Sequence, residues 1–219
     1  MGGMSSGRVR RTSAKASVPP VDAPMAMTGG QGDRAVPGIL AADCPVAGVS
    51  ASRVRRVAPR GSQRRARAAT ARQAAVAGYN VCINYVTHAA KSVDLVVAEC
   101  ETLGRKVLAV KVDVGNAKDV AELFTACDNA LGPVSLLVNN AGIIGKATTG
   151  ADLPDDALAR TFEVNVYGNV YCAREAIQRM ATSKGGSGAI IVNVYSVAAR
   201  LGSPGEYVHY AASKAAVET

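Results

Sequence analysis

Short apolar blocks alternate with longer helix-forming segments, and this alternation constrains the fold more than any other feature of the sequence. The blocks lack the polar and apolar alternation of half-exposed strands, so we expect strands that are buried on both faces. The predicted strands are 79–85, 106–114, 134–142 and 188–196, and the predicted helices are 67–78, 89–104, 117–132, 154–183 and one that begins near Tyr207. Strands and helices in this order indicate βαβ units and a parallel sheet.

The predicted fold class is therefore α/β, a doubly wound parallel sheet. Such sheets bind ligands outside the carboxyl ends of their strands. Polar side chains gather at these ends, namely Asp113, Asn139, Asn140 and Ser196. The sequence thus predicts a binding site at this edge of the sheet.

The first third of the chain has a different composition. Residues 1–78 carry a net charge of +10, whereas residues 79–219 carry −2, so the overall charge of +8 belongs to the N-terminal segment. Residues 1–65 are rich in Gly, Pro and Arg and show no regular period, which predicts a disordered tail. The second predicted unit, 66–219, is a partial nucleotide-binding domain.

Two functions of the basic segment stay open as alternatives. An arginine-rich, acid-poor beginning is typical of organellar targeting, and arginines can also bind nucleic-acid phosphates. No aromatic residue lies among the arginines to stack on bases, so we do not expect nucleic-acid binding. No apolar run approaches the length of about 20 residues that spans a membrane. Four cysteines in regular apolar segments favour reduced thiols and a cytoplasmic protein: Cys82, Cys100, Cys127 and Cys172.

Five short motifs follow one another in a fixed order. They are "DV" (113–114), "NNAG" (139–142), Asn165, Ser196 and "YAASK" (210–214). Together they resemble the short-chain dehydrogenase/reductase family, Rossmann-type enzymes that move hydride between NAD(P) and an alcohol or carbonyl. The resemblance covers about 66–219. It implies a small-molecule substrate and a homo-oligomer.

Tyr210 and Lys214 lie one helical turn apart, so their side chains share a helix face. Carbonyl reduction needs an acid for the developing alkoxide, and an adjacent ammonium group lowers the pKa of a phenol. We therefore expect Tyr210 to be the acid/base and Lys214 to lower its pKa. Ser196 is placed to hydrogen-bond the substrate oxygen. The resemblance adds Asn165 as the proton-relay asparagine and implies that Lys214 holds the nicotinamide ribose.

The resemblance also implies the cofactor contacts. Asp113 and Val114 would contact the adenine, and Asn140, Ala141 and Gly142 would form a backbone wall. Tyr85 is the expected cofactor contact at the end of the second strand. An acid there favours NAD, but Tyr85 and its neighbours include none. We therefore expect NADP, with NAD as the alternative. The two histidines, His88 and His209, predict no metal site.

Both ends of the chain depart from the family pattern. The glycine turn that cradles the pyrophosphate should fall at 60–67, where "RGSQRRAR" keeps only Gly61. The preceding stretch, "SRVRRVAPR", carries arginines where a buried first strand needs apolar residues. The chain ends at Thr219, inside the helix of Tyr210. We therefore expect a sheet that is incomplete at both ends, without its first and last two strands, and an incomplete subunit interface.

These departures leave two functions open. The motifs favour an oxidoreductase, whereas the lost glycines and the position of Thr219 favour a catalytically inactive Rossmann-like remnant. For the activity of this exact polypeptide, the second alternative is favoured.

The family pattern resumes cleanly at about Ala68, which suggests a reading-frame change upstream. Arg, Ala, Gly and Pro are the residues that a GC-rich gene yields out of frame. Translating the other two frames upstream of Ala68 should produce an apolar strand and a TGxxxGxG turn. Their absence from both frames would refute the frame change.

Overall fold

The computed structural model describes residues 39–42, 62–86 and 90–219. It contains a five-stranded sheet in the order β3-β2-β1-β4-β5. The strands are β1 (Ile39–Ala42), β2 (Asn80–Tyr85), β3 (Val107–Lys111), β4 (Val134–Asn139) and β5 (Ile190–Asn193). This is the doubly wound order that the alternating pattern predicts, and the order reverses between β1 and β4.

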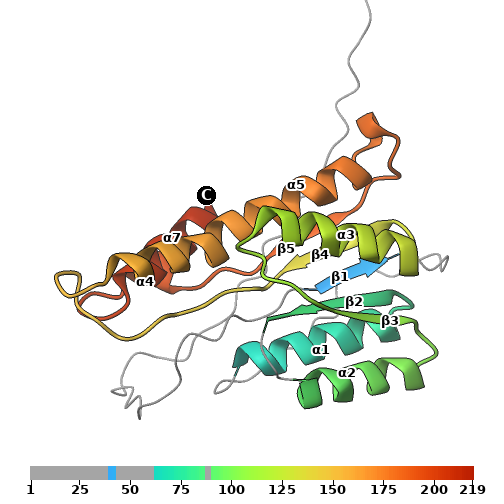
Figure 1. Cartoon of the computed structure of the whole chain (residues 1–219), viewed down its shortest axis with the longest axis horizontal. Helices are drawn as coiled ribbons and strands as arrows, with labels where there is room; N and C mark the ends of the chain where they lie inside the picture. Colours follow the sequence, from blue (N-terminus) through green and yellow to red (C-terminus); the bar gives the residue numbers. More distant parts are fainter. Residues whose placement is uncertain (1–38, 43–61, 87–89) are drawn as a thin grey trace, which may run out of the picture.

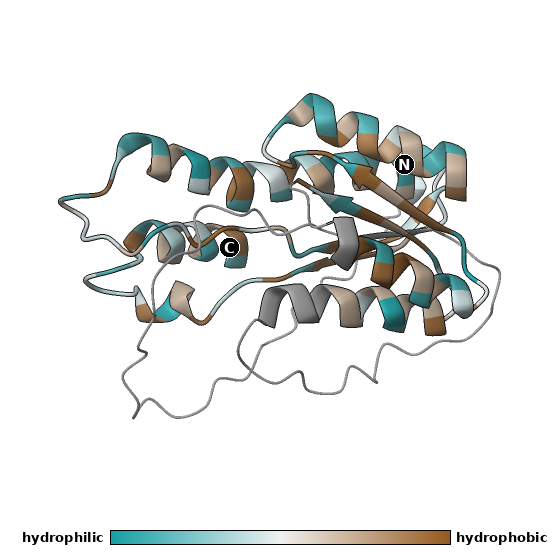
Figure 2. Cartoon of the chain, turned by 60° about the horizontal axis from the view of Figure 1, so that its bottom comes forward, coloured by the Kyte–Doolittle hydropathy of each residue, from teal (hydrophilic) through white to brown (hydrophobic). Residues whose placement is uncertain are grey.

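Helices cover both faces of the sheet (Figure 1). The helices α1 (Ser62–Val76) and α2 (Ala90–Thr102) lie on one face. The helices α3 (Ala117–Leu131) and α5 (Gly168–Met180) lie on the other. Figure 2 shows the hydrophobic strands between these helices, whose outward sides are more hydrophilic.

Two cores result from this layering. One lies between the sheet and α3 and α5, and it includes Phe124, Leu137 and Cys172. The other lies under α1 and α2 and includes Ala71, Val81 and Val138. The four cysteines named above are buried and free of disulfides, as predicted.

The long helix predicted at 154–183 is one continuous helical run with a wider turn inside it. It comprises α4 (Asp155–Phe162), the π-helical turn η2 (Glu163–Tyr167) and α5, followed by the short η3 (Thr182–Lys184). π-Helical turns are rare and often lie at functional sites. Here the turn contains Asn165, one of the predicted site residues.

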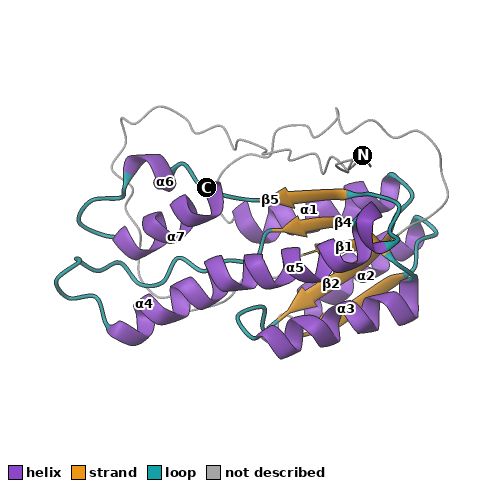
Figure 3. Cartoon of the chain, turned by 90° about the horizontal axis from the view of Figure 1, so that it is seen from above, coloured by secondary structure: helices purple, strands orange, loops and turns teal. Residues whose placement is uncertain are grey.

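The run of α4, η2 and α5 extends past the sheet at the carboxyl end of its strands (Figure 3). There it lies beside α7 (Val208–Glu218), which in turn packs against α6 (Ala198–Leu201). The predicted helix near Tyr207 is thus confirmed as α7. Its position brings "YAASK" to the edge where the strands end.

The central strand departs from the predicted sheet. β1 pairs antiparallel with both β2 and β4, whereas β2–β3 and β4–β5 are parallel pairs. The prediction of a wholly parallel sheet without a first strand is corrected here, because a strand lies inside the segment 1–65 that we expected to be disordered. Without β1, the inner edges of β2 and β4 would lack backbone partners, and the apolar run Ile39–Ala42 supplies them. The stretch "SRVRRVAPR" (52–60) lies outside the described residues.

Packing of α3 generates a first structural prediction. Leu123 is 2% exposed in the core beneath α3, whereas Leu95 on α2 is 66% exposed. Leu123→Ala should lower the free energy of unfolding by about 3 kcal/mol, because it leaves a cavity. The matched variant Leu95→Ala should change it by less than about 0.5 kcal/mol. Urea denaturation followed by circular dichroism measures both, and equal losses would contradict this assignment of the core.

Candidate active site

The predicted site residues gather at the carboxyl edge of the sheet. Asp113 and Val114 follow β3, and Asn140, Ala141 and Gly142 follow β4. Ser196 follows β5, and the remaining residues come from helices: Asn165 from η2, and Tyr210 and Lys214 from α7. Five separate segments therefore supply the site.

The side chain of Asn165 joins three of these segments. Its Oδ1 accepts a hydrogen bond from the backbone N–H of Ile143 (2.8 Å), and its Nδ2 donates to the carbonyl of Ile143 (2.9 Å) and to Oγ of Ser213 (2.9 Å). Ser213 Oγ in turn donates to the carbonyl of Tyr210 (2.7 Å). Asn165 is 1% exposed and Ser213 is fully buried. The amide thus holds the loop after β4 against α7, and its predicted role as a proton relay stays a prediction.

Tyr210 is 8% exposed, and its environment shifts its pKa in two directions. Burial raises the pKa above the ordinary tyrosine value, and a hydrogen bond with the Ser196 side chain lowers it by a smaller amount. The net shift is upward, opposite to the lowering that we expected from Lys214. The spacing in the sequence shows that the two side chains are neighbours, but the desolvation that disfavours a phenolate depends on the packing around α7.

Lys214 is as deeply buried as Tyr210. Its Nζ donates a hydrogen bond to the carbonyl of Val194 (3.1 Å) and lies 5.9 Å from the centre of the Tyr210 ring. Burial lowers the pKa of Lys214 to about 8. At neutral pH the group is therefore mostly an ammonium, but one that gives up its proton more readily than an exposed lysine does.

The loop after β4 packs closely against Asn165 and Lys214 at Gly142. A Cβ atom added to Gly142 would lie 3.1 Å from Oδ1 of Asn165 and 3.4 Å from Nζ of Lys214. The adjacent Asn140 is 9% exposed, and its Nδ2 is buried without a hydrogen-bond partner among the described residues. The missing Cβ of Gly142 therefore makes room for the Asn165 amide and the Lys214 ammonium group. The Asn140 donor without a partner fits a polar ligand.

The two predicted adenine contacts, Asp113 and Val114, make other contacts within the protein. The Asp113 carboxylate forms an ion pair with Arg160 of α4, and its Oδ1 accepts from the backbone N–H of Gly115 (2.9 Å). Val114 is 3% exposed and packs against Gly168, so only its backbone could meet a ligand at this edge. No sequence pattern indicates that Arg160 reaches Asp113, because the two residues are 47 positions apart.

The cofactor-discriminating end of β2 is described only in part. The Tyr85 carbonyl accepts from the backbone N–H of Val112 (2.9 Å), which fixes the end of β2 beside β3. After Val86, residues 87–89 lie outside the described residues. Discrimination between NADP and NAD therefore stays a prediction.

The pyrophosphate turn is not formed in the described residues. α1 begins at Ser62, so most of the positions 60–67 are helical. β1 is antiparallel, so its carboxyl end at Ala42 lies opposite Asn80 and Val134, which begin their strands. A strand that ends at the wrong edge cannot lead into a glycine turn beside Asn140. The residues thus fit the nicotinamide half of a dinucleotide and do not fit its pyrophosphate. The glycine-rich stretch 27–33 lies outside the described residues.

A small cavity lies near the point where the strand order reverses. Its volume is about 20 Å³, and its lining includes Asn84, Asn139 and Asn169. Asn139 Nδ2 donates to Oδ1 of Asn193 (3.0 Å) and to Oδ1 of Asn169 (3.1 Å). The cavity has room for about one water molecule and not for a cofactor.

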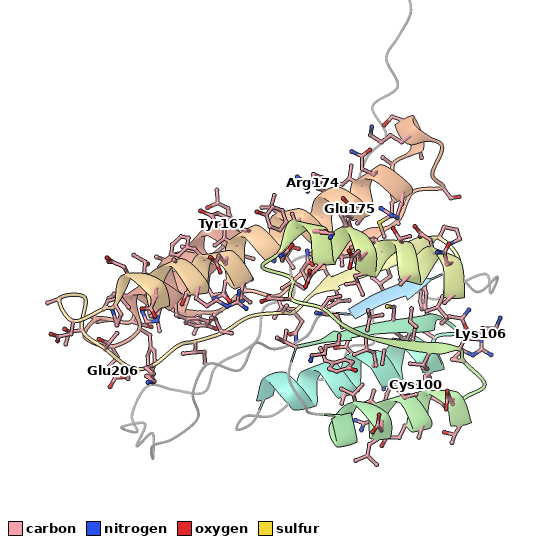
Figure 4. All side chains as sticks on the ribbon, in the orientation of Figure 1. Cys100, Lys106, Tyr167, Arg174, Glu175 and Glu206 are labelled. Carbon is pink, nitrogen blue, oxygen red and sulfur yellow. The ribbon has the colours of Figure 1, made fainter. Side chains whose placement is uncertain are left out.

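The described residues were also compared with what a metal site and a membrane-spanning helix require. Among residues 39–42, 62–86 and 90–219, no cluster of His, Cys, Asp and Glu could hold a metal ion. Within the same ranges, every helix is too short or too polar to cross a membrane. Tyr167 and Arg174 lie on the outer side of the long helix, away from the sheet and from the candidate site (Figure 4).

Comparisons with known proteins agree with this geometry. Residues 67–219 match a family model described as short chain dehydrogenase. The match begins where the sequence pattern resumes, at the last of the positions 60–67 that were expected for the glycine turn.

Individual relatives cover the same part of the chain. The chain is 45% identical over 153 residues to an uncharacterized oxidoreductase, YgfF, of Escherichia coli, covering 69% of this chain and 61% of that protein. It is 37% identical over 147 residues to an L-rhamnose 1-dehydrogenase (NAD(P)(+)) of a Sphingomonas species, covering 67% of this chain and 56% of that one. The chain thus spans about 60% of the length of these relatives.

A solved structure shares the fold. A short chain dehydrogenase from Burkholderia cenocepacia, crystallised in complex with NADP, superposes with a TM-score of 0.63 at 33% identity. The superposition covers 68% of this chain and 58% of that one.

The pKa of Lys214 generates a prediction on stability. The value of about 8 in the folded state lies below the ordinary lysine pKa of about 10.4. Below pH 8 the buried ammonium therefore costs stability, and this cost disappears as the pH rises from 8 toward 10.4. Lys214→Met should raise the free energy of unfolding relative to wild type, and this gain should be larger below pH 8 than at pH 10.

Taking the difference in free energy of unfolding between Lys214→Met and wild type cancels the contribution of groups that titrate alike in both proteins. Burial raises the pKa of the Cys172 thiol to about 12, and this group titrates alike in both proteins. The exposed Lys184 provides a control, because Lys184→Met should differ from wild type equally at pH 7 and pH 10. Urea denaturation at the two pH values gives the differences. A pH-independent difference for Lys214→Met would contradict the depressed pKa.

Proposed function

The chain belongs to the short-chain dehydrogenase family, and on this premise we propose that it is an NADP-dependent oxidoreductase acting on a small alcohol or carbonyl compound. The observation that carries the proposal is the grouping of the buried Tyr210 and Lys214 with the half-buried Ser196, next to Gly142. This grouping offers an acid, a second hydrogen-bonding hydroxyl and a cation at one edge of the sheet.

A bound nicotinamide cofactor would supply or accept the hydride. Lys214, whose Nζ lies close to Gly142, and the unpartnered amide of Asn140 in the same loop would hold its nicotinamide half. Tyr210 would donate the phenolic proton to the carbonyl oxygen in reduction, and would take the alcohol proton in oxidation. Ser196, whose side chain lowers the pKa of Tyr210, would hold the same substrate oxygen.

The pKa shifts favour the reductive direction. Burial raises the pKa of Tyr210, so the phenol carries its proton at neutral pH and is ready to act as an acid. The ammonium of Lys214, one helical turn away, would stabilise the phenolate that remains after the transfer.

NADP is the proposed cofactor because the end of β2 presents no carboxylate to repel a 2′-phosphate. The NADP complex of the Burkholderia relative supports this choice. The proposed macromolecular partner is a second copy of the chain. The outer side of the long helix exposes apolar side chains, with Val170 57% and Ile177 44% exposed.

A second candidate function is a catalytically inactive binding remnant. The antiparallel β1 and the helical residues from Ser62 onward favour it, because β1 ends at the opposite edge of the sheet and α1 contains most of the positions expected for the pyrophosphate turn. Titration with NADPH and NADH, followed by nicotinamide fluorescence, separates the candidates. Saturable binding supports the oxidoreductase, and no binding at millimolar cofactor supports the remnant.

The proposed acid generates a prediction on activity. Tyr210→Phe removes the proton donor and should lower kcat by about 10²- to 10⁴-fold while the Kd for NADPH changes little. Tyr167→Phe is the matched control, since this tyrosine is 50% exposed on the long helix and should keep wild-type turnover. The assay is NADPH oxidation with a panel of small aldehydes and ketones. Full turnover by Tyr210→Phe would remove Tyr210 from the mechanism.

A further inference from the structure

His209, the residue before the proposed acid, is 2% exposed and contacts the loop after β4. Its Nε2 lies 3.1 Å from the carbonyl oxygen of Ile144. A carbonyl oxygen can only accept, so the imidazole donates from Nε2. The other ring nitrogen, Nδ1, is buried without a hydrogen-bond partner among the described residues.

The loop is shaped to receive this imidazole. Gly145 has a φ of +78°, and a Cβ atom at this position would lie only 2.7 Å from Nε2 of His209. A side chain at residue 145 would therefore be strained by the backbone and would displace the ring. Gly145 and His209 form a matched pair, in which the missing side chain of one makes room for the other.

The loop is held from two further directions. Asn165 binds the backbone N–H and carbonyl of Ile143, one residue before the His209 contact. Beyond Gly145, the backbone N–H of Thr148 donates to the carbonyl of Glu206 (3.1 Å), in the segment that leads into α7. Figure 4 shows Glu206 at this junction of the two loops. The loop is thus attached through Ile143, Ile144 and Thr148. Only the attachment at Ile144 is made by a residue next to Tyr210 in the chain, namely His209.

We propose that His209 is a positioning residue, which holds the Ile144 carbonyl and thereby fixes the loop 143–145 beside Tyr210. Ile144 is 36% exposed, so this loop, which begins directly after Gly142, carries an accessible apolar side chain. Fixing this loop sets where an apolar part of the substrate lies relative to the phenol. The kinetic consequence rests on the proposed function, whereas the contact itself does not.

Replacing His209 by the two amides of different length tests the proposal. The Nε2 amide of Gln lies at nearly the same reach as Nε2 of His, whereas the amide of Asn is one carbon shorter. His209→Asn should lower kcat/KM for a carbonyl substrate by about 10-fold or more, because misplacement by about 1 Å can cost up to about 100-fold. His209→Gln should restore it to within about threefold of wild type, and the Kd for NADPH should change less than twofold in both.

A merely structural histidine would give a different result. In that case, Asn and Gln would lower the thermal midpoint and the activity in parallel. Equal kcat/KM values for the two variants would overturn the proposal.

Two measurements without cofactor keep this test apart from the proposed function. Long-range ¹H–¹⁵N NMR of the full chain should show His209 with its proton on Nε2, and a proton on Nδ1 alone would overturn the proposal. Hydrogen exchange at the Thr148 amide should accelerate in His209→Asn and stay slow in His209→Gln. If wild type neither binds NADPH nor turns over, the oxidoreductase proposal fails, while these two measurements still decide the role of His209.

Discussion

The buried amide of Asn165 connects the elements from which the site is built. It pairs with both backbone groups of Ile143 and with Ser213, and so joins the π-helical turn, the loop after β4 and α7. Each bond lies where water cannot replace it, so loss of the amide would leave buried donors and acceptors unsatisfied. The places of Gly142, Tyr210 and Lys214 relative to one another depend on this connection.

Much of the fold could be predicted because its signals are local. Buried strands such as Val134–Asn139 and helices such as Ala117–Leu131 are encoded by apolar blocks, helix formers and end residues within each segment. Asn116, for example, accepts from the backbone N–H groups of Lys118 and Asp119 and so starts its helix where the pattern places it. The direction of β1 was not predictable, since four apolar residues pair equally well with either orientation of a neighbour.

The candidate site shows the same division. The spacing of Tyr210 and Lys214 follows from helix geometry, so their proximity could be inferred. The pKa of Tyr210 could not, because it depends on burial by segments far away in the sequence. Ser213 and His209 were missed for a related reason, since their partners lie 48 and 65 residues away. A single sequence carries no signal for such pairs, although Ser213 lies inside the quoted motif.

The short central strand also determines how the sheet holds together. β1 is the only described strand between two parallel pairs, β3–β2 and β4–β5, and it contributes four residues to each ladder. If it detaches, the pairs remain connected through α1 and α3, whose cores include residues of both β2 and β4. The domain would then behave as two half-sheets under a shared helical cover, with local opening concentrated at their seam. The seam lies where the strand order reverses, which is also where such sheets bind ligands. Opening of the sheet at β1 would therefore change the shape of the ligand crevice at the same time.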